Sequence, residues 1–252
     1  YLERLRPFYD SELVKVITGI RRCGKSTILR QVIAEIKENG VDDSHIVYIN
    51  FEDYKYHKLT DADAFYEHIE QKIVDEGKYY LFFDEIQNVN KFEIVVNSFR
   101  ATHNVSIFIT GSNSKLLSGE LATHLSGRTI SLRVLPFNFM EFCQYKDISV
   151  PDYESLLTEY MTYGGLPLVC GADNKETKEV ILSNIYDAVV LKDIVMRNKI
   201  NSPLVLEKVL DYVVGNSSLT VSGNAIAGTL SSNGHKVSAP VVYDYLRCIV
   251  DA

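Results

Sequence analysis

The first half of the sequence alternates short apolar runs with segments in which apolar residues recur every three or four positions. The apolar runs, rich in β-branched and aromatic residues, cover residues 13–18, 46–51, 79–83, 105–109 and 128–135. Helical spacing covers residues 25–39, 61–76, 91–102 and 115–125. The runs predict strands and the spacing predicts helices. Strands alternating with helices indicate right-handed crossovers, so we expect an α/β fold with a parallel sheet.

The second half of the sequence shows helical spacing only. We expect helices over residues 153–163, 175–200, 203–215, 222–231 and 239–250, with glycine, proline and serine between them. The polar stretch 146–154 lies between the two patterns and indicates a connector. The sequence therefore predicts an α/β part followed by an all-helical part.

Composition narrows the class of protein. The chain has 252 residues, of which 46% are hydrophobic and 23% charged, so a sizeable core can form. The net charge of −7 excludes a generally basic nucleic-acid-binding surface. No apolar run reaches the length of a membrane span. The four cysteines are scattered without metal-ligand spacing, which favours a reducing, cytoplasmic location.

The two ends of the sequence lead to one more expectation. The chain begins with Tyr1 instead of Met and has no apolar signal-peptide core. It stops at Ala252 inside an apolar periodic pattern. We therefore expect this chain to be a fragment of a longer protein.

The segment GIRRCGKS, from Gly19 to Ser26, fits the phosphate-binding pattern G-x-x-x-x-G-K-[ST]. It follows a predicted strand and opens a predicted helix, as that motif requires. Gly19 and Gly24 let the backbone wrap closely around phosphate oxygens. Lys25 is expected to reach the β- and γ-phosphates, Ser26 to bind Mg²⁺ and Thr27 to bond the α-phosphate. The alternative is a glycine-containing turn with an unrelated lysine.

Three further residues lie inside the same loop. Arg21 and Arg22 either face phosphate or pair with acids on neighbouring helices. For Cys23, the positive N–H groups of the loop would lower the thiol pKa and make it sensitive to oxidation. The plainer interpretation, which we prefer, is that Cys23 is a small residue that fits.

An acidic pair completes a nucleotide site. Asp84 and Glu85 directly follow the apolar run 79–83, and ligands bind at the carboxyl ends of strands in open α/β folds. Asp84 is expected to hold Mg²⁺ and Glu85 to polarise the attacking water. The alternative is a strand end with two solvated acids. The sequence Asn90-Lys91-Phe92-Glu93 lacks the aspartate of a guanine-binding motif, so ATP hydrolysis is favoured over GTP hydrolysis.

At these residues the chain resembles a known family. The segments VITGIRRCGKST, LFFDEIQNV, IFITGSNSKLL and LSGRTISLRVLPFNFMEF are similar to those of prokaryotic AAA+ (P-loop, ASCE) ATPases that carry a winged helix and a C-terminal restriction-endonuclease-like domain. The resemblance implies the strand order 5-1-4-3-2 and a missing nuclease-like domain. It divides the chain into a nucleotide-binding domain (residues 1–145), a helical connector or lid (146–200) and a truncated winged-helix-like region (201–252).

The resemblance also implies two more catalytic residues. A polar sensor of the γ-phosphate follows strand four, where Asn113 is the first choice and Ser112 the second. Either residue is alternatively a helix cap. Arg128 precedes strand five, where such ATPases place an arginine that reaches the nucleotide of a neighbouring subunit. That role requires self-association; the alternative is an arginine bonded to a helix terminus or a surface acid.

The last two predicted helices suggest a helix-turn-helix, with residues 237–249 as the recognition helix. From Leu204 to Ala252 there are three basic and four acidic residues, so packing between helices is favoured over DNA contact. The sequence thus predicts Mg²⁺-dependent ATP binding and hydrolysis that drives conformational change in an unknown partner. A slow nucleotide-gated switch and an ATP-controlled DNA-binding regulator remain as alternatives.

Overall fold

The structure is a computed structural model and describes residues 1–111, 125–147, 152–196 and 198–250. The chain divides into two compact units, Tyr1–Ala172 and Asp173–Ala252. The domain boundaries at residues 145 and 200 stay predictions. Helices α6 (Phe139–Lys146) and α7 (Tyr153–Tyr163), on either side of the polar connector, share a small core around Phe142 and Leu156.

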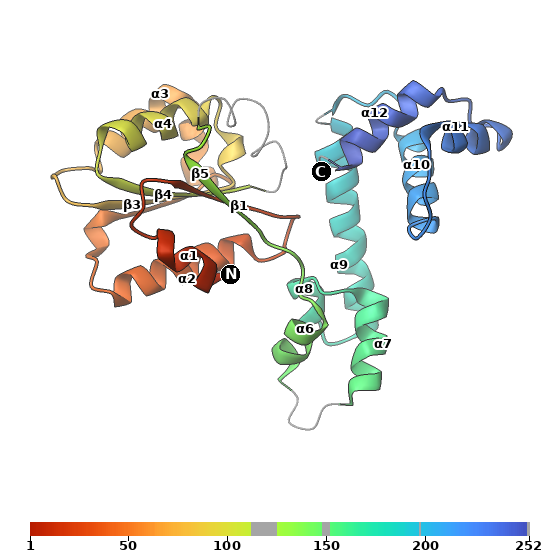
Figure 1. The fold of residues 1–252 in the computed structure, drawn as a ribbon, viewed down its shortest axis with the longest axis horizontal. Helices are drawn as coiled ribbons and strands as arrows, with labels where there is room; N and C mark the ends of the chain where they lie inside the picture. Colours follow the sequence, from red (N-terminus) through yellow and green to blue (C-terminus); the bar gives the residue numbers. More distant parts are fainter. Residues whose placement is uncertain (112–124, 148–151, 197, 251–252) are drawn as a thin grey trace. The chain divides into compact units, whose positions relative to one another are not determined.

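A five-stranded parallel sheet forms the centre of the first unit (Figure 1). Its strands are β1 (Val14–Thr18), β2 (Ile46–Asn50), β3 (Tyr79–Asp84), β4 (Val105–Gly111) and β5 (Thr129–Arg133). Their spatial order is β2-β3-β4-β1-β5, and every neighbouring pair is parallel. This confirms the expected α/β class and, read from the other edge, the expected order 5-1-4-3-2.

Helices cover both faces of the sheet (Figure 1). Helices α1 (Leu2–Leu5) and α2 (Lys25–Glu38) lie on one face, and α3 (Ala62–Glu70) and α4 (Phe92–Thr102) lie on the other. Each face has its own apolar core. Strands β1, β3 and β4 are buried at every position, whereas the edge strand β2 alternates between buried and half-buried residues. The continuous apolar runs in the sequence correspond to the central strands.

Helix α3 and the segment that precedes it differ from the predictions. Helix α3 ends at Glu70 instead of continuing to residue 76. The chain turns back at Asp75, whose Oδ1 accepts the Gly77 N–H at 2.7 Å, and the Val74 N–H donates to the Tyr79 hydroxyl at 3.1 Å. The seven residues Tyr54–Thr60 also form a 3₁₀ helix, which the apolar pattern did not indicate.

Helix α6 (Phe139–Lys146) was not predicted, because its eight residues are too few for a clear helical period. A local signal was nevertheless present. Asn138 accepts the Glu141 N–H and Glu141 accepts the Asn138 N–H, both at 2.9 Å, which forms a capping box. Helices α7 (Tyr153–Tyr163) and α8 (Pro167–Cys170) complete the first unit.

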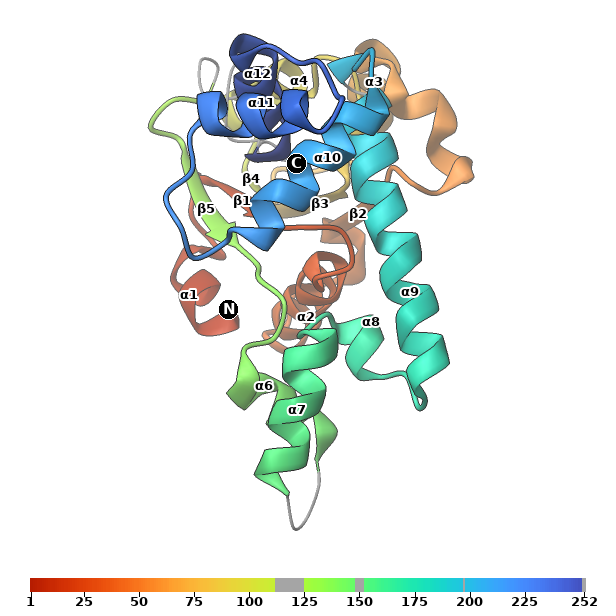
Figure 2. The same cartoon turned by 90° about the vertical axis from the view of Figure 1, so that its right-hand side faces the viewer.

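The second unit is helical, as predicted (Figure 2). Helix α9 (Lys175–Asp187) continues as a π-helical segment, Ala188–Met196, where one α-helix up to residue 200 was expected. Helices α10 (Pro203–Gly215), α11 (Gly223–Ser232) and α12 (Ala239–Val250) follow. Their apolar faces meet in a core that includes Leu206, Ile226 and Val242. Within the described residues, no helix has the length and apolarity needed to cross a membrane.

Candidate nucleotide-binding site

The predicted phosphate loop joins β1 to α2. Gly19 has φ +153° and Gly24 has φ +107°, conformations that favour glycine. A Cβ atom on Gly19 would lie 2.3 Å from the carbonyl oxygen of Val134, so the loop backbone passes directly against the chain that follows β5. Nothing lies within 4 Å of the corresponding position on Gly24. Gly19 is therefore required both by its φ angle and by the close approach of the backbone.

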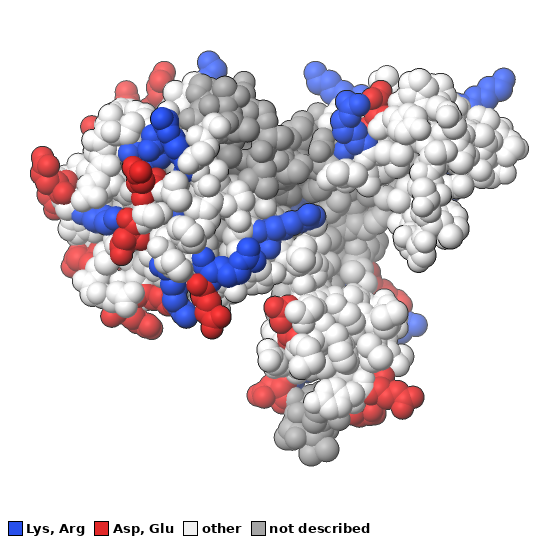
Figure 3. Space-filling view, viewed as in Figure 1, with Lys and Arg blue, Asp and Glu red and all other residues white. Residues whose placement is uncertain are grey.

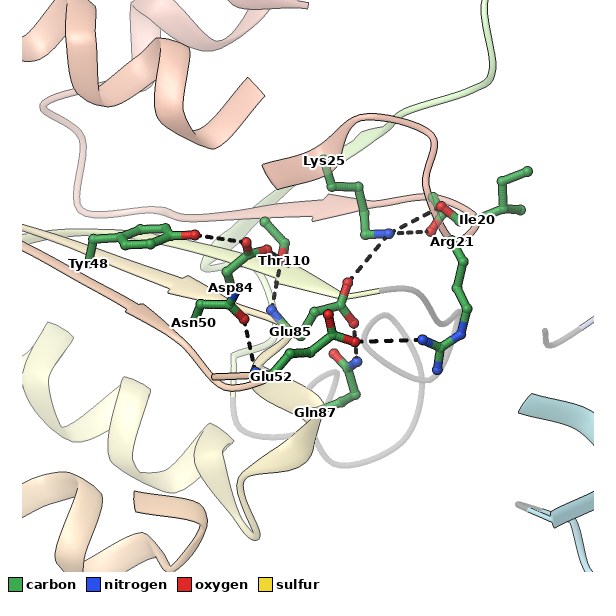
Figure 4. Close-up of polar contacts among 11 residues, drawn as sticks. Ile20, Arg21, Lys25, Tyr48, Asn50, Glu52, Asp84, Glu85, Gln87 and Thr110 are labelled. Atoms are coloured by element: carbon green, nitrogen blue, oxygen red, sulfur yellow. Dashed lines mark hydrogen bonds and ion pairs between the residues drawn. The ribbon is translucent and has the colours of Figure 1, made fainter. Parts of the chain in front are cut away.

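Lys25 opens helix α2, and its side chain folds back over the loop (Figure 4). Its Nζ donates to the carbonyl oxygens of Gly19 at 3.1 Å and Ile20 at 3.2 Å. Among the described residues no side chain caps the start of α2, since the N-cap position is Gly24. The first-turn N–H groups and the helix dipole therefore favour an anion here. Ser26, which is half-buried, and Thr27, which is exposed, lie in the same first turn.

Asp84 ends strand β3 and has no exposed surface. The Tyr48 hydroxyl donates to its Oδ2 at 3.0 Å, and the Thr110 hydroxyl donates to its Oδ1 (Figure 4). Burial, together with the negative charge of Asp84, raises the pKa of Tyr48 to about 12. Sequence analysis named neither Tyr48 nor Thr110. The alternation of residues along each strand indicates only the face of the sheet on which Tyr48 and Thr110 lie, and it does not indicate that they meet Asp84.

Glu85 follows Asp84 in the left-handed conformation, with φ +55°. This backbone turn is stabilised by a bond from the Glu85 N–H to the Thr110 hydroxyl oxygen at 3.0 Å. The Glu85 carboxylate lies with Oε1 3.5 Å from Lys25 Nζ, while its Oε2 accepts a hydrogen bond from the Gln87 amide (Figure 4). The structure thus brings together Lys25 and Glu85, which are 60 residues apart in the sequence.

The remaining loop residues have different surroundings. Arg21 Nη1 lies 3.7 Å from Glu52 Oε1, and Glu52 follows β2 instead of belonging to a neighbouring helix. Arg22 is exposed, with φ +62°. Cys23 is buried, and burial raises its thiol pKa, although the positive charge of Lys25 opposes the rise. The raised pKa favours the plainer interpretation of Cys23 as a small residue that fits.

Arg128 lies away from these residues. It is exposed and directly precedes β5, and its carbonyl oxygen accepts the N–H of Val14, the first residue of β1. Because β1 and β5 are parallel, Arg128 lies at the amino edge of the sheet, whereas the phosphate loop leaves the carboxyl edge. Its Nη1 is 3.4 Å from Asn97 Oδ1 on α4. The predicted sensors Ser112 and Asn113 lie outside the described residues.

The donor set at the carboxyl edge of the sheet matches a nucleotide-bound magnesium ion better than a metal held by protein alone. Within the described ranges, no group of three or more His, Cys, Asp or Glu side chains is placed to hold a metal. One serine hydroxyl and one carboxylate, completed by phosphate oxygens and water, are a common Mg²⁺ environment. Ser26 and Asp84 fit that description.

The described charged side chains of the second unit are few on one of its faces. On the face shown in Figure 3, most of its surface is uncharged. On helix α12 the exposed side chains include the apolar Val241 and the aromatic Tyr243, and Arg247 lies 3.8 Å from Asp244. Helices α11 and α12 pack against each other through their apolar faces, and the helix-turn-helix and its contact with DNA stay predictions.

Both parts of the chain match known protein families or proteins. Residues 154–252 match a domain of unknown function. An uncharacterized protein of Haemophilus influenzae is 38% identical over 255 residues, which cover 100% of this chain and 64% of that protein. Uncharacterized protein MJ1544 of Methanocaldococcus jannaschii is 33% identical over 248 residues, which cover 95% of this chain and 55% of that protein. The chain thus spans less than two thirds of these relatives.

Several solved structures also match the chain, at low sequence identity. The Aeropyrum pernix ORC1 protein in complex with DNA is 14% identical, with 97% of this chain and 80% of that chain covered and a TM-score of 0.49. AMPPCP-bound DnaA from Aquifex aeolicus is 12% identical, with coverage of 98% and 85% and a TM-score of 0.44. Residues 11–143, more than half of the chain, match the family model described as an AAA domain. The chain belongs to the AAA domain family, and its first unit is a P-loop AAA+ domain.

Proposed function

We propose that this protein binds ATP together with Mg²⁺ and hydrolyses the bond between its β- and γ-phosphates. The supporting observation is the 3.5 Å approach of Lys25 Nζ to Glu85 Oε1, beside the fully buried Asp84, at the carboxyl edge of the sheet. Lys25 would hold the phosphates, Ser26 and Asp84 would hold Mg²⁺, and Glu85 would orient the attacking water. Mg²⁺ would neutralise charge on the phosphates.

The partners of Lys25 support this role. The Lys25 side chain is 4% exposed, and its ammonium contacts two loop carbonyl oxygens and the Glu85 carboxylate. Phosphate oxygens are stronger acceptors for an ammonium than neutral carbonyl oxygens. A bound triphosphate would therefore draw Lys25 away from Glu85 and leave that carboxylate free to accept a proton from water.

Self-association is part of the proposal, because Arg128 lies at the sheet edge opposite the phosphate loop. Arg128 would serve the site of a second copy instead of its own. Asn113 is proposed to sense the γ-phosphate. The energy of hydrolysis would drive a conformational change in the chain and its partner.

A slow nucleotide-gated switch is the second candidate, and one observation favours it. Both oxygens of the Glu85 carboxylate are engaged, one near Lys25 and one by Gln87. If nucleotide displaces only Lys25, Gln87 would still restrain Glu85, and turnover would stay slow. ATP would then be bound for long periods as a signal.

The test measures ATP hydrolysis against protein concentration for four proteins: wild type, Glu85→Gln, Arg128→Ala and, as a control, Arg4→Ala. Arg4 is an exposed arginine on α1. We expect specific activity to rise with concentration in wild type and Arg4→Ala, and to stay low in Arg128→Ala. Glu85→Gln should bind ATP normally and lose about 10²-fold or more in rate. A slow rate of ATP hydrolysis that changes neither with protein concentration nor in Arg128→Ala would favour the nucleotide-gated switch.

A further inference from the structure

Tyr48 lies on β2, in the edge strand next to the one that carries the acidic pair. Its hydroxyl spans the gap between the two strands and donates to Asp84 Oδ2 at 3.0 Å. In the strand register Tyr48 is opposite Phe82, so Asp84 is its diagonal neighbour two residues further along. Only a long side chain reaches a diagonal partner of this kind.

Thr110 makes the matching contact from the other side. It lies on β4, the neighbour of β3 away from β2, and its hydroxyl donates to Asp84 Oδ1. The same hydroxyl oxygen accepts the N–H of Glu85 at 3.0 Å. One threonine therefore links the orientation of the Asp84 carboxylate to the backbone turn that places Glu85.

We propose that Tyr48 and Thr110 are positioning residues for magnesium: together they fix the Asp84 carboxylate in the orientation that holds the Mg²⁺ of a bound nucleotide. The inference rests on the proposed ATPase function. A buried carboxylate with a hydroxyl on each oxygen cannot rotate without breaking a hydrogen bond. Its remaining lone pairs stay available for the waters of the metal. Residues of this type commonly tune metal affinity by one to two orders of magnitude.

The test compares Tyr48→Phe with Tyr80→Phe. Tyr80 is a matched control, because its hydroxyl also donates to an aspartate, Asp10, and it faces the same side of the sheet, at the start of β3. A fluorescent ATP analogue is titrated with each protein in EDTA and then across a Mg²⁺ series. We expect Tyr48→Phe to match wild type in EDTA and in melting temperature. It should need about tenfold more Mg²⁺ for the half-maximal gain in nucleotide affinity.

A second pair of variants tests the hydroxyl of Thr110. Thr110→Ser keeps the donor and should behave as wild type, whereas Thr110→Val removes it and should raise the Mg²⁺ requirement. If Tyr48→Phe and Tyr80→Phe share the wild-type Mg²⁺ midpoint, this inference is overturned and the proposed ATPase stands. If wild type itself binds no nucleotide, or binds it regardless of Mg²⁺, the proposed function and this inference both fail.

Discussion

Lys15 is the second residue of strand β1, and none of its surface is exposed. The carboxyl end of the same strand leads into the phosphate loop. Its Nζ donates to the carbonyl oxygen of Ser11 at 2.9 Å and to the Ser106 hydroxyl oxygen at 2.7 Å. The ammonium also lies 4.6 Å from the centre of the Phe108 ring. Burial, assisted by the nearby positive charge of Lys78, lowers the pKa of Lys15 from 10.5 to about 7.

This lowered pKa makes stability depend on pH with a definite sign. Between about pH 7 and 10.5 the unfolded lysine is protonated and the folded one is largely neutral, so unfolding takes up a proton. The free energy of unfolding therefore rises with pH in this window. The slope that Lys15 contributes approaches ~1.4 kcal/mol per pH unit, which amounts to ~2 kcal/mol between about pH 7.5 and 9.

The perturbation is Lys15→Met, which keeps an unbranched chain and removes the titrating group. The matched control is Lys37→Met, because Lys37 is exposed on α2. Urea-induced unfolding is followed by far-UV circular dichroism for both variants and wild type at several pH values in this window. In wild type the free energy of unfolding should rise with pH, and we expect this rise to be ~2 kcal/mol smaller in Lys15→Met. In Lys37→Met the rise should be the same as in wild type. Parallel curves for wild type and Lys15→Met would refute the reasoning.

Three other predictions concern the first unit. Gly19→Ala should weaken ATP binding more than Gly24→Ala, because only Gly19 adds a 2.3 Å backbone clash to its positive φ; equal loss in a binding titration would contradict this. Asn138→Ala should lower the free energy of unfolding by ~1 kcal/mol, as urea denaturation would show, since it removes the capping box of α6. At about pH 8, a disulfide reagent should modify Cys143 faster than Cys23, because Cys143 is half-buried whereas Cys23 is buried and its pKa is raised. Faster modification of Cys23 in the native protein would contradict this argument.

Part of this protein could be predicted from its sequence because the information is local. The strands β1 to β5 follow from short β-branched and aromatic runs, and helix α2 from its apolar period. The spacing of Gly19, Gly24 and Lys25 between a strand and a helix indicates a phosphate loop without knowledge of any distant contact. The strand order, by contrast, came from the family resemblance, since periodicity alone does not say which strands are neighbours.

Other features depended on tertiary structure, for a common physical reason: they join segments that are far apart in the chain. Tyr48 and Thr110 meet Asp84 across 36 and 26 residues, and Lys15 meets Ser106 across 91. Each pair depends on the register of two strands, and a shift of one residue would turn these side chains to the opposite face. The sequence determined that Asp84 ends a buried strand. Only the packing of β2 and β4 against that strand decided which hydroxyl groups hold its carboxylate.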